Sequence, residues 1–260
     1  MRLLRILWTL LREIGDENAY SRYLASRGLA PSRERAQSMI MAGQVQVAGQ
    51  RIDKPGTRIA ADSQVEIVGQ PLRYASRGGL KLEGALEDFG VIPEGKICLD
   101  AGSSTGGFAD CLLQHGASKV YAVDVTIAQL DWKLQQDARV VRIEKNARHL
   151  QAGDIADAVA LITADLSFIS VTKVLPALSS VAAPGTDLLI LIKPQFELEK
   201  RDVGRGGIVR DPALHQRAVQ GVVDAANRLG LEVVGVKPSK LPGAEGNQEF
   251  FLHAKTRRME

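Results

Sequence analysis

The sequence predicts an α/β protein in which a doubly wound, mostly parallel sheet follows a small α+β module. Two observations predict this fold class. From Gly95 onward, buried-type apolar runs alternate with amphipathic segments, and the preceding residues carry short helix patterns followed by short strand patterns. Regular alternation of strands and helices is typical of a parallel sheet with helices on both faces. A length of 260 residues is sufficient for both parts.

The small module is expected over residues 18–70. A short helix over 18–26 ends before Gly28, and a second helix starts at Ser32 as its N-cap and ends before Gly43. Alternating apolar residues at 45–48 and 64–68 predict two strands, with a turn at Gly49 to Arg51 between them. Residues 1–17 begin with basic and leucine-rich sequence but lack a small-residue cleavage site, so they predict a leader helix rather than a signal peptide.

The larger domain is expected over residues 78–258, after a linker at 71–77. Its six predicted strands are apolar runs separated by amphipathic segments: 97–100, 120–124, 159–165, 187–192, 231–236 and 249–254. Cys98 and Cys111 are too few for a disulfide framework and lack metal-ligand spacing, so both are expected to be buried thiols. The sequence suggests no metal site.

Charge and hydropathy limit the class of protein. The net charge is +3, but the first 75 residues carry +4 and the remainder carries −1, an asymmetry that suits a polyanion-binding module attached to a second domain. No run approaches the roughly 18 apolar residues needed to cross a bilayer. We therefore expect a cytoplasmic location and no membrane partner.

A glycine-rich turn directly follows the first predicted strand of the sheet. Gly102 allows a tight turn at the strand end, and Gly106 and Gly107 allow a ligand to approach the next helix. The spacing matches neither the dinucleotide fingerprint nor the phosphate-binding loop. A carboxylate at the end of the second strand suits the hydroxyls of a nucleoside ribose. The candidate cofactor-binding residues are Asp100, Gly102, Ser103, Thr105, Gly106, Gly107, Phe108 and Asp124.

Two further strand ends carry charged residues, Asp165 and Lys193. Ligands of open α/β sheets bind at this edge, and a lysine that follows an apolar run is partly desolvated, so it can serve as a general base that Asp165 orients. A structural ion pair is the alternative. The motif that grips an exocyclic base amine is absent, and neither cysteine lies at these strand ends, which disfavours thiolate attack on a pyrimidine ring. Deprotonation of a hydroxyl, such as a ribose 2′-OH, remains.

Several long motifs resemble those of the TlyA family of ribosomal RNA 2′-O-methyltransferases, also called hemolysin A. The resemblance runs from about residue 19 to 255, and the stretches that carry it begin at Ser76, Ser103, Gln129, Asp165, Lys193, Gly206 and Glu245. It implies a Rossmann-like S-adenosylmethionine-dependent methyltransferase domain of the FtsJ type. It also implies four catalytic residues, Lys81, Asp165, Lys193 and Glu249, with Glu245 as a rival for the fourth.

The first module resembles the small RNA-binding domain of ribosomal small-subunit protein four. This resemblance implies an α+β RNA-binding domain that contacts phosphates through Arg33, Arg35, Arg51 and Lys54. A solvated basic face is the alternative. The chain departs from the family before the first helix, where residues 17–23 replace an Arg-Leu-Asp start, and after Asp124, where Thr126-Ile-Ala replaces Gly-Tyr-Gly.

The sequence therefore predicts transfer of a methyl group from S-adenosylmethionine to a ribose 2′-OH of ribosomal RNA or ribosomal subunits. Lys193 is the expected base. Three alternatives remain: a non-catalytic RNA-binding or ribosome-assembly factor, methylation of a base instead of a ribose, and a membrane-lysing hemolysin.

Overall fold

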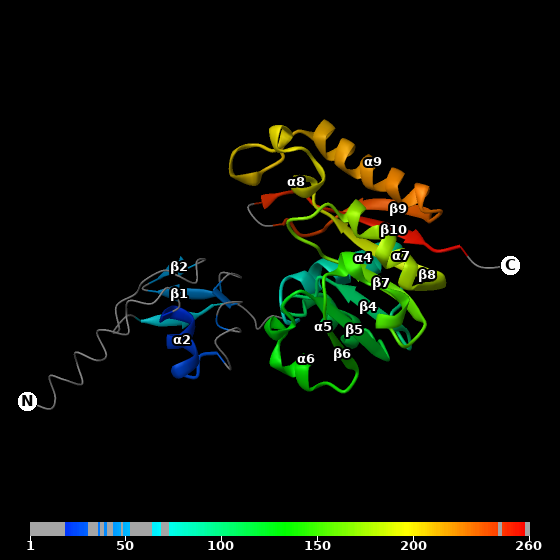
Figure 1. The fold of residues 1–260 in the computed structure, drawn as a ribbon. Coiled ribbons are helices and arrows are strands. Elements are labelled where there is room, and N and C mark those ends of the chain that lie inside the picture. Colours follow the sequence, from blue (N-terminus) through cyan, green and yellow to red (C-terminus); the bar gives the residue numbers. More distant parts are fainter. Residues whose placement is uncertain are drawn as a thin grey trace, which may run out of the picture. The chain divides into compact units, whose positions relative to one another are not determined.

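The computed structural model describes residues 19–30, 36, 39–40, 44–47, 49–52, 64–68, 73–243 and 246–257. The chain divides into two compact units, residues 1–72 and 73–260, which are described separately (Figure 1). None of the helices within the described ranges is long and apolar enough to cross a membrane.

The first unit contains a helix and a three-stranded antiparallel sheet. Helix α2 (Ala19–Ser26) precedes β1 (Val45–Val47), β2 (Gln50–Ile52) and β3 (Val65–Ile67), and the sheet order is β2-β1-β3. Leu24, Ile40 and Val45 are fully buried in its core. The predicted turn at Gly49 to Arg51 is wrong in extent, because Gly49 alone adopts positive φ (77°) and pairing with β1 already starts at Gln50.

The second unit is built on a seven-stranded sheet of order β6-β5-β4-β7-β8-β10-β9. Strands β4 to β8 run parallel, and β10 pairs antiparallel with both β8 and β9. The strands are β4 (Ile97–Ala101), β5 (Lys119–Asp124), β6 (Val140–Glu144), β7 (Val159–Ala164), β8 (Ala182–Ile192), β9 (Glu232–Pro238) and β10 (Phe250–Lys255). The predicted α/β fold with a mostly parallel sheet is confirmed.

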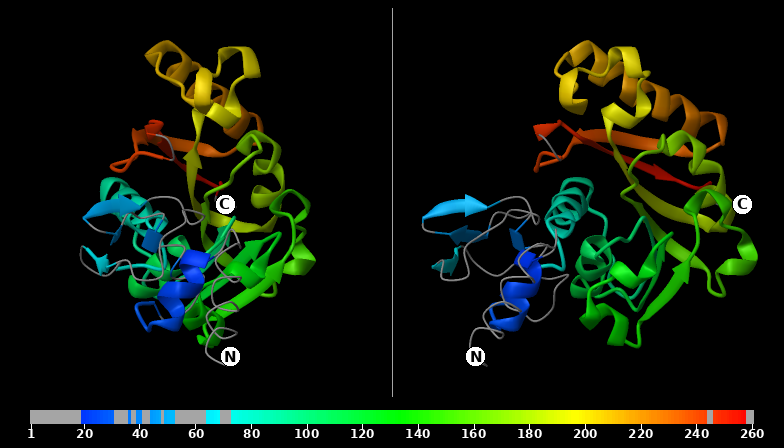
Figure 2. Two further views of the ribbon diagram at one scale, coloured as in Figure 1. Left: turned by 90° about the vertical axis from the view of Figure 1, so that its left-hand side faces the viewer. Right: turned by 60° about the vertical axis from the view of Figure 1, so that its left-hand side comes forward.

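Helices cover both faces of this sheet (Figures 1 and 2). They are α4 (Gly78–Phe89), α5 (Gly107–Gln114), α6 (Trp132–Gln136), α7 (Leu175–Val181), α8 (Pro194–Glu197) and α9 (Pro212–Arg228). Successive strand residues point to opposite faces, so Cys98 packs in the core beneath α4 and α5, while Leu99 packs in the core beneath α7 and α9. Cys98 and Cys111 are both buried free thiols, as predicted.

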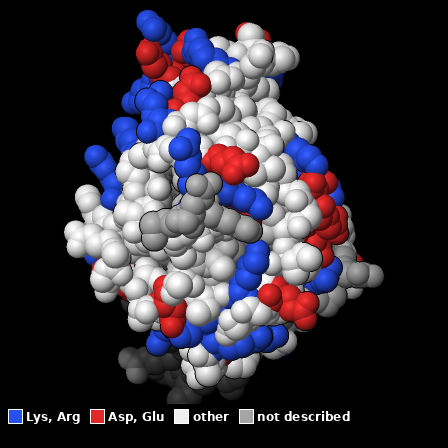
Figure 3. Space-filling view, turned by 90° about the vertical axis from the view of Figure 1, so that its right-hand side faces the viewer, with Lys and Arg blue, Asp and Glu red and all other residues white. Residues whose placement is uncertain are grey.

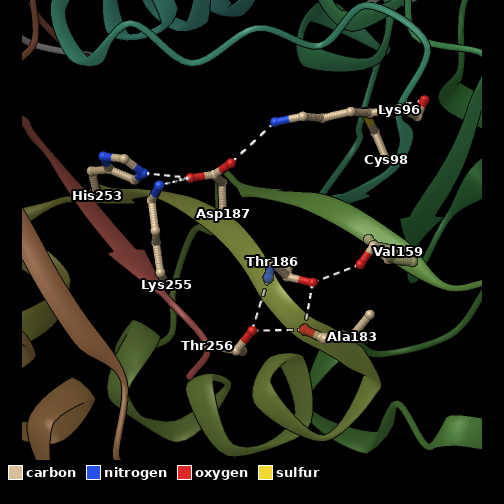
Figure 4. Close-up of polar contacts among 9 residues, drawn as sticks. All are labelled: Lys96, Cys98, Val159, Ala183, Thr186, Asp187, His253, Lys255 and Thr256. Carbon is tan, nitrogen blue, oxygen red and sulfur yellow. Dashed lines mark hydrogen bonds and ion pairs between the residues drawn. The ribbon is translucent and has the colours of Figure 1, made fainter. Parts of the chain in front are cut away.

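A polar cluster ties β8 and β10 to the start of β4 (Figure 4). Asp187 on β8 pairs with Lys96 at 3.0 Å, with His253 at 2.9 Å and with Lys255 at 3.3 Å. Lys255 is the last residue of β10, whose antiparallel pairing places it beside Asp187. The cluster therefore lies at the edge where the parallel strands begin, opposite to the edge where they end.

Candidate functional site

A cavity of about 580 Å³ opens where the first four parallel strands of the sheet end. Its wall includes Gly102 after β4, Asp124 at the end of β5, Asn146 after β6 and Asp165 after β7. Cavities of this size accommodate a nucleoside-sized ligand. The position is the carboxyl edge of the sheet, where the sequence predicted a ligand.

The loop after β4 has a backbone that only glycine can adopt at its first turn. Gly102 has φ of 81°, and a Cβ there would lie 2.5 Å from the carbonyl oxygen of Asp165. Its N–H donates to the carbonyl oxygen of Val123 at 2.8 Å. The turn therefore brings the ends of β4, β5 and β7 close together at the cavity wall.

Gly106 sets the start of helix α5. It is the N-cap residue with φ of 92°, and a Cβ there would lie 2.2 Å from the side chain of Leu134. The N–H of Asp131 donates to the carbonyl oxygen of Thr105 at 3.1 Å, so the segment before α6 packs over the glycine-rich loop. Any side chain at Gly106 would displace this packing.

Asp124 is held with its carboxylate at the cavity wall. Its Oδ2 accepts the N–H of Ser104 at 2.9 Å, and its Oδ1 accepts the N–H of Thr126 at 3.0 Å. Each carboxylate oxygen has a second lone-pair site, so both can still accept a hydroxyl proton. The replacement of the family's Gly-Tyr-Gly by Thr126-Ile-Ala leaves this carboxylate in place.

The residues around the cavity fit S-adenosylmethionine. Asp124 would offer its carboxylate to the ribose hydroxyls of a bound cofactor, and the Ser103 hydroxyl is buried without a hydrogen-bond partner among the described residues. A buried hydroxyl of this kind is normally paired, so the Ser103 oxygen is available to a polar ligand group. The N-terminus of α5, beginning at Gly107, favours a carboxylate such as that of the methionine part.

Two predicted cofactor-binding residues lie behind the cavity. Asp100 is fully buried, and its carboxylate accepts the N–H of Ala109 and the hydroxyl of Thr163, both at 3.0 Å. Burial is the main reason that the pKa of Asp100 is raised to about 7. Phe108 is buried with its ring 6.1 Å from that of Phe251. Both side chains therefore support the loop from within the core.

Lys193 and Asp165 form an ion pair at the edge of the cavity. The Lys193 Nζ lies 2.5 Å from the Asp165 carboxylate and donates to the Ser167 hydroxyl at 3.0 Å. The Lys193 side chain is 12% exposed. The side chain is therefore largely enclosed, and two partners fix the direction of the amine. The sequence did not single out Ser167.

Lys81 and Glu249 form a second pair, which is more deeply buried. The Lys81 Nζ lies 2.6 Å from the Glu249 carboxylate, and the Glu249 side chain is only 2% exposed. Gly243 packs directly on this carboxylate, where an added Cβ would lie 2.1 Å from Glu249 Oε1. Nothing in the local sequence around Gly243 indicates this contact with the Glu249 carboxylate.

The register of β8 and β10 brings the two pairs to the same region. Phe250 lies opposite Ile192, so the next residue of each strand places Glu249 opposite Lys193. Directly opposite residues of antiparallel strands project to the same face. Lys81 reaches Glu249 from helix α4, which covers that face. The four predicted catalytic residues are thus assembled from α4, β7, β8 and the approach to β10.

Some predicted residues lie outside the described parts of the structure. Arg33, Arg35 and Lys54 of the first unit and Glu245 of the second are not described, and for Arg51 only its place in β2 is given. Their predicted roles stay predictions.

Comparisons with known proteins match both units. A model of the FtsJ-like methyltransferases matches residues 74–256, and a model of the S4 domain matches residues 22–65. A 16S/23S rRNA (cytidine-2′-O)-methyltransferase TlyA of Mycobacterium tuberculosis is 48% identical over 235 residues, which cover 90% of this chain and 88% of that relative.

Two hemolysin-named proteins are also similar. Hemolysin A of Brachyspira hyodysenteriae is 42% identical over 233 residues, covering 89% of this chain and 97% of the relative. A solved structure of a hemolysin-named protein from Streptococcus thermophilus has a TM-score of 0.73 at 40% identity, covering 91% of this chain and 87% of that one. The similarity therefore extends over both units.

Proposed function

Because the chain belongs to the FtsJ-like methyltransferases, we propose that it transfers a methyl group to a ribose 2′-hydroxyl of ribosomal RNA. The observation that carries this proposal is the Lys193–Asp165 ion pair, because Asp165 lines the same cavity as Asp124. The carboxylate suited to the cofactor ribose and the candidate base thus lie at the same edge of the sheet. The relative from Mycobacterium tuberculosis is named for the same reaction.

S-adenosylmethionine, when bound, supplies an electrophilic methyl group on a sulfonium. Asp124 would hold the cofactor ribose, and the loop from Gly102 to Gly107 would hold the methionine part. Holding the acceptor hydroxyl close to the methyl group supplies much of the rate enhancement. The apolar side chains of Leu166 and Ile169 form part of the cavity wall.

Lys193, in its deprotonated form, accepts the proton of the ribose hydroxyl, which makes that oxygen a nucleophile toward the methyl group that the bound cofactor would supply. The proton stays on the Lys193 amine until solvent removes it. Asp165 orients this amine and stabilises its charged form after the step. Glu249, which an extension of the β8–β10 register by one residue places opposite Lys193, and its partner Lys81 from α4 fix the acceptor side of the site.

The S4 domain match of the first unit supports RNA as the substrate, and we place the reaction in the cytoplasm, where ribosomal subunits occur. The alternative of a non-catalytic assembly factor does not require an assembled Lys–Asp and Lys–Glu set. The alternative of a membrane-lysing protein predicts leakage of liposomes by the intact chain, whereas the proposed function predicts none.

The test compares wild type, Lys193→Ala and Lys193→Arg on unmodified ribosomal subunits with radiolabelled S-adenosylmethionine. Arginine retains the ion pair with Asp165 but cannot act as a base, so both variants should lose on the order of 10² to 10⁴ in rate. Nucleoside analysis after digestion should place the wild-type label on ribose. Label on a base, or full activity of Lys193→Arg, would contradict the proposal.

A further inference from the structure

The segment 200–210, between α8 and α9, has a net positive charge and is flanked by the acidic residues Glu199 and Asp211. Its eleven residues include four basic residues and one acidic residue, Asp202, for a net charge of +3, which equals that of the whole chain. Lys200, Arg201, Arg205 and Arg210 are all exposed. A solvated charged surface needs no such imbalance.

Most of these cations have no acidic partner. Arg201 pairs with Glu199 at 2.9 Å, and the single acidic residue of the segment, Asp202, pairs with Arg217 of α9. Among the described residues, Lys200, Arg205 and Arg210 make no ion pair. Three exposed cations are therefore available for an external anion.

The segment is held by Asn247, which is 3% exposed. The Asn247 amide accepts the N–H of Val209 at 2.9 Å and donates to the carbonyl oxygen of Gly207 at 2.9 Å. The N–H of Gly204 also donates to the carbonyl oxygen of Ile208 at 3.1 Å, which closes the turn around Arg205. Arg205 and Arg210 therefore extend from a fixed backbone, which lowers the entropy lost on binding.

The same contacts tie the segment to the candidate active site. Asn247 lies two residues before Glu249, and the segment starts seven residues after Lys193. In between, the Glu197 carboxylate accepts the Ser170 hydroxyl at 2.5 Å and the N–H of Val171 at 2.9 Å, which anchors α8 to the loop after β7. Figure 2 shows α8 and the loops around it beyond the ends of the strands, next to β10.

At Gly206, the tip of the segment, a ligand can also approach the backbone closely. Gly206 has φ of 77°, is exposed, and an added Cβ would meet no atom within 4 Å. Its N–H makes no hydrogen bond within the described structure. A backbone N–H beside an unpaired arginine is a common arrangement for binding phosphate oxygens.

The side of the second unit that faces away from residues 200–210 does not share the charge excess of that segment. Figure 3 views the side at which the C-terminus lies in Figure 1, and there basic and acidic side chains are interspersed. This is the edge where the parallel strands begin, since Lys255 ends β10 beside Asp187. The unpaired cations of 200–210 instead lie beyond the edge that carries Lys193.

We propose that residues 200–210 bind the phosphates of the RNA strand that presents the target ribose to Lys193, as a contact surface separate from the S4 domain. This inference rests on the proposed function and extends it to the path of the substrate. Lys200, Arg205 and Arg210 contact successive phosphates, and Asn247 keeps that contact in fixed relation to Glu249. Phosphate contacts of this kind set the register of the strand without reading its sequence.

The first test measures binding of unmodified ribosomal subunits over a series of salt concentrations. The variant Arg205→Ala/Arg210→Ala is compared with Arg142→Ala/Arg257→Ala, which removes two exposed, unpaired arginines from β6 and from the chain end after β10. Loss of two phosphate contacts should weaken binding roughly tenfold near 0.1 M salt and lower the log–log salt slope by about two. The control should match wild type in both.

The outcomes separate this inference from the proposed function. Unchanged affinity and salt slope in Arg205→Ala/Arg210→Ala, with wild type methylating normally, would overturn the inference alone. Binding by wild type without methyl transfer would overturn the proposed function, while the salt series would still test the segment. The affinity for S-adenosylmethionine should stay at the wild-type value, and its loss in the variant would show a folding defect, which Arg205→Lys/Arg210→Lys would then resolve by keeping the charge.

The second test locates the segment on its partner. Cys98 and Cys111 are buried, so Lys200→Cys introduces an accessible thiol for a tethered source of hydroxyl radicals. Cleavage of RNA close to the methylated nucleotide is expected. Damage confined to a ribosomal protein would overturn the inference, because it would identify an acidic protein surface as the partner.

Discussion

At the scale of single residues, the effect of the Lys81–Glu249 pair on stability can be separated from its proposed effect on activity. Glu249 is 2% exposed, so replacing Lys81 by Met leaves an unpaired buried carboxylate and should cost about 3 to 5 kcal/mol of unfolding free energy. The double variant Lys81→Met/Glu249→Gln removes both charges and should recover most of that stability. Its methyl transfer should stay low, measured beside chemical unfolding of the same samples.

The comparison distinguishes a catalytic set from a structural ion pair. If Lys81→Met/Glu249→Gln is both stable and active, the pair has only a structural role. Arg201→Ala serves as the control, because its pair with Glu199 is largely exposed and its loss should leave stability unchanged.

Asp100 should make the stability of the protein depend on pH. Burial raises its pKa to about 7 in the folded state, above the ordinary value of 3.8, so the folded state binds the proton more tightly. Its stabilising contribution is complete below about pH 4 and is lost as pH rises to about 7, a change of roughly 4 kcal/mol. Asp100→Asn removes this dependence, so thermal unfolding between pH 4.5 and 7.5 should favour the variant increasingly as pH rises. A constant difference in Tm would contradict the expectation.

The sequence identified those site residues that terminate strands. Asp124, Asp165 and Lys193 each follow an apolar run, and strand ends of a parallel sheet converge. Lys81 and Glu249 came only from family resemblance, because a charge on helix α4 and a residue before β10 meet only in the folded chain. The support roles of Asp100 and Phe108 depend on burial, which local sequence does not determine.

At the scale of elements, the Asp187 cluster joins three segments that are distant in sequence (Figure 4). Burial alone would raise the pKa of Asp187, but hydrogen bonds from His253 and Lys96 and the charge of Lys255 hold it well below the ordinary value. A lowered pKa means that this stabilisation is present above about pH 4 and is lost as pH falls further.

Asp187→Asn should therefore destabilise the fold at neutral pH by roughly 3 kcal/mol, with the deficit shrinking below about pH 4. Chemical unfolding at pH 7 and pH 3 measures both values. Glu199→Gln, which alters an exposed pair, should match wild type at each pH. A deficit that persists at pH 3 would mean that Asp187 acts through packing.

In the second unit, the strands that the sequence predicted are mostly apolar runs, whereas β6, which it missed, carries charged residues. Strand β6 has the sequence VVRIE, in which Arg142 and Glu144 are exposed because β6 is an edge strand with a single neighbour. Charged residues at alternate positions resemble a helix surface in a short segment. The insertion of β10 between β8 and β9 also depends on long-range pairing, which no local pattern encodes.

At the scale of the whole molecule, the chemistry is confined to one of the two units. All residues that line the cavity lie between 102 and 174, and the four candidate catalytic residues lie between 81 and 249. The second unit begins at Arg73, whose neighbour Tyr74 is buried and hydrogen-bonded to Glu83 of α4. A chain of residues 73–260 retains these contacts.

We therefore expect the 73–260 chain to bind S-adenosylmethionine with the affinity of the full chain, measured by calorimetry, because no cavity residue is lost. Its affinity for ribosomal subunits should fall by tenfold or more, since the S4 domain and its basic residues are absent. Residual, salt-dependent binding should remain through residues 200–210, and Arg205→Ala/Arg210→Ala in the short chain should remove it. If the short chain binds subunits as tightly as the full chain, the S4 domain is not the principal RNA contact. If it binds none, the expectation that residues 200–210 bind RNA without the first unit is wrong.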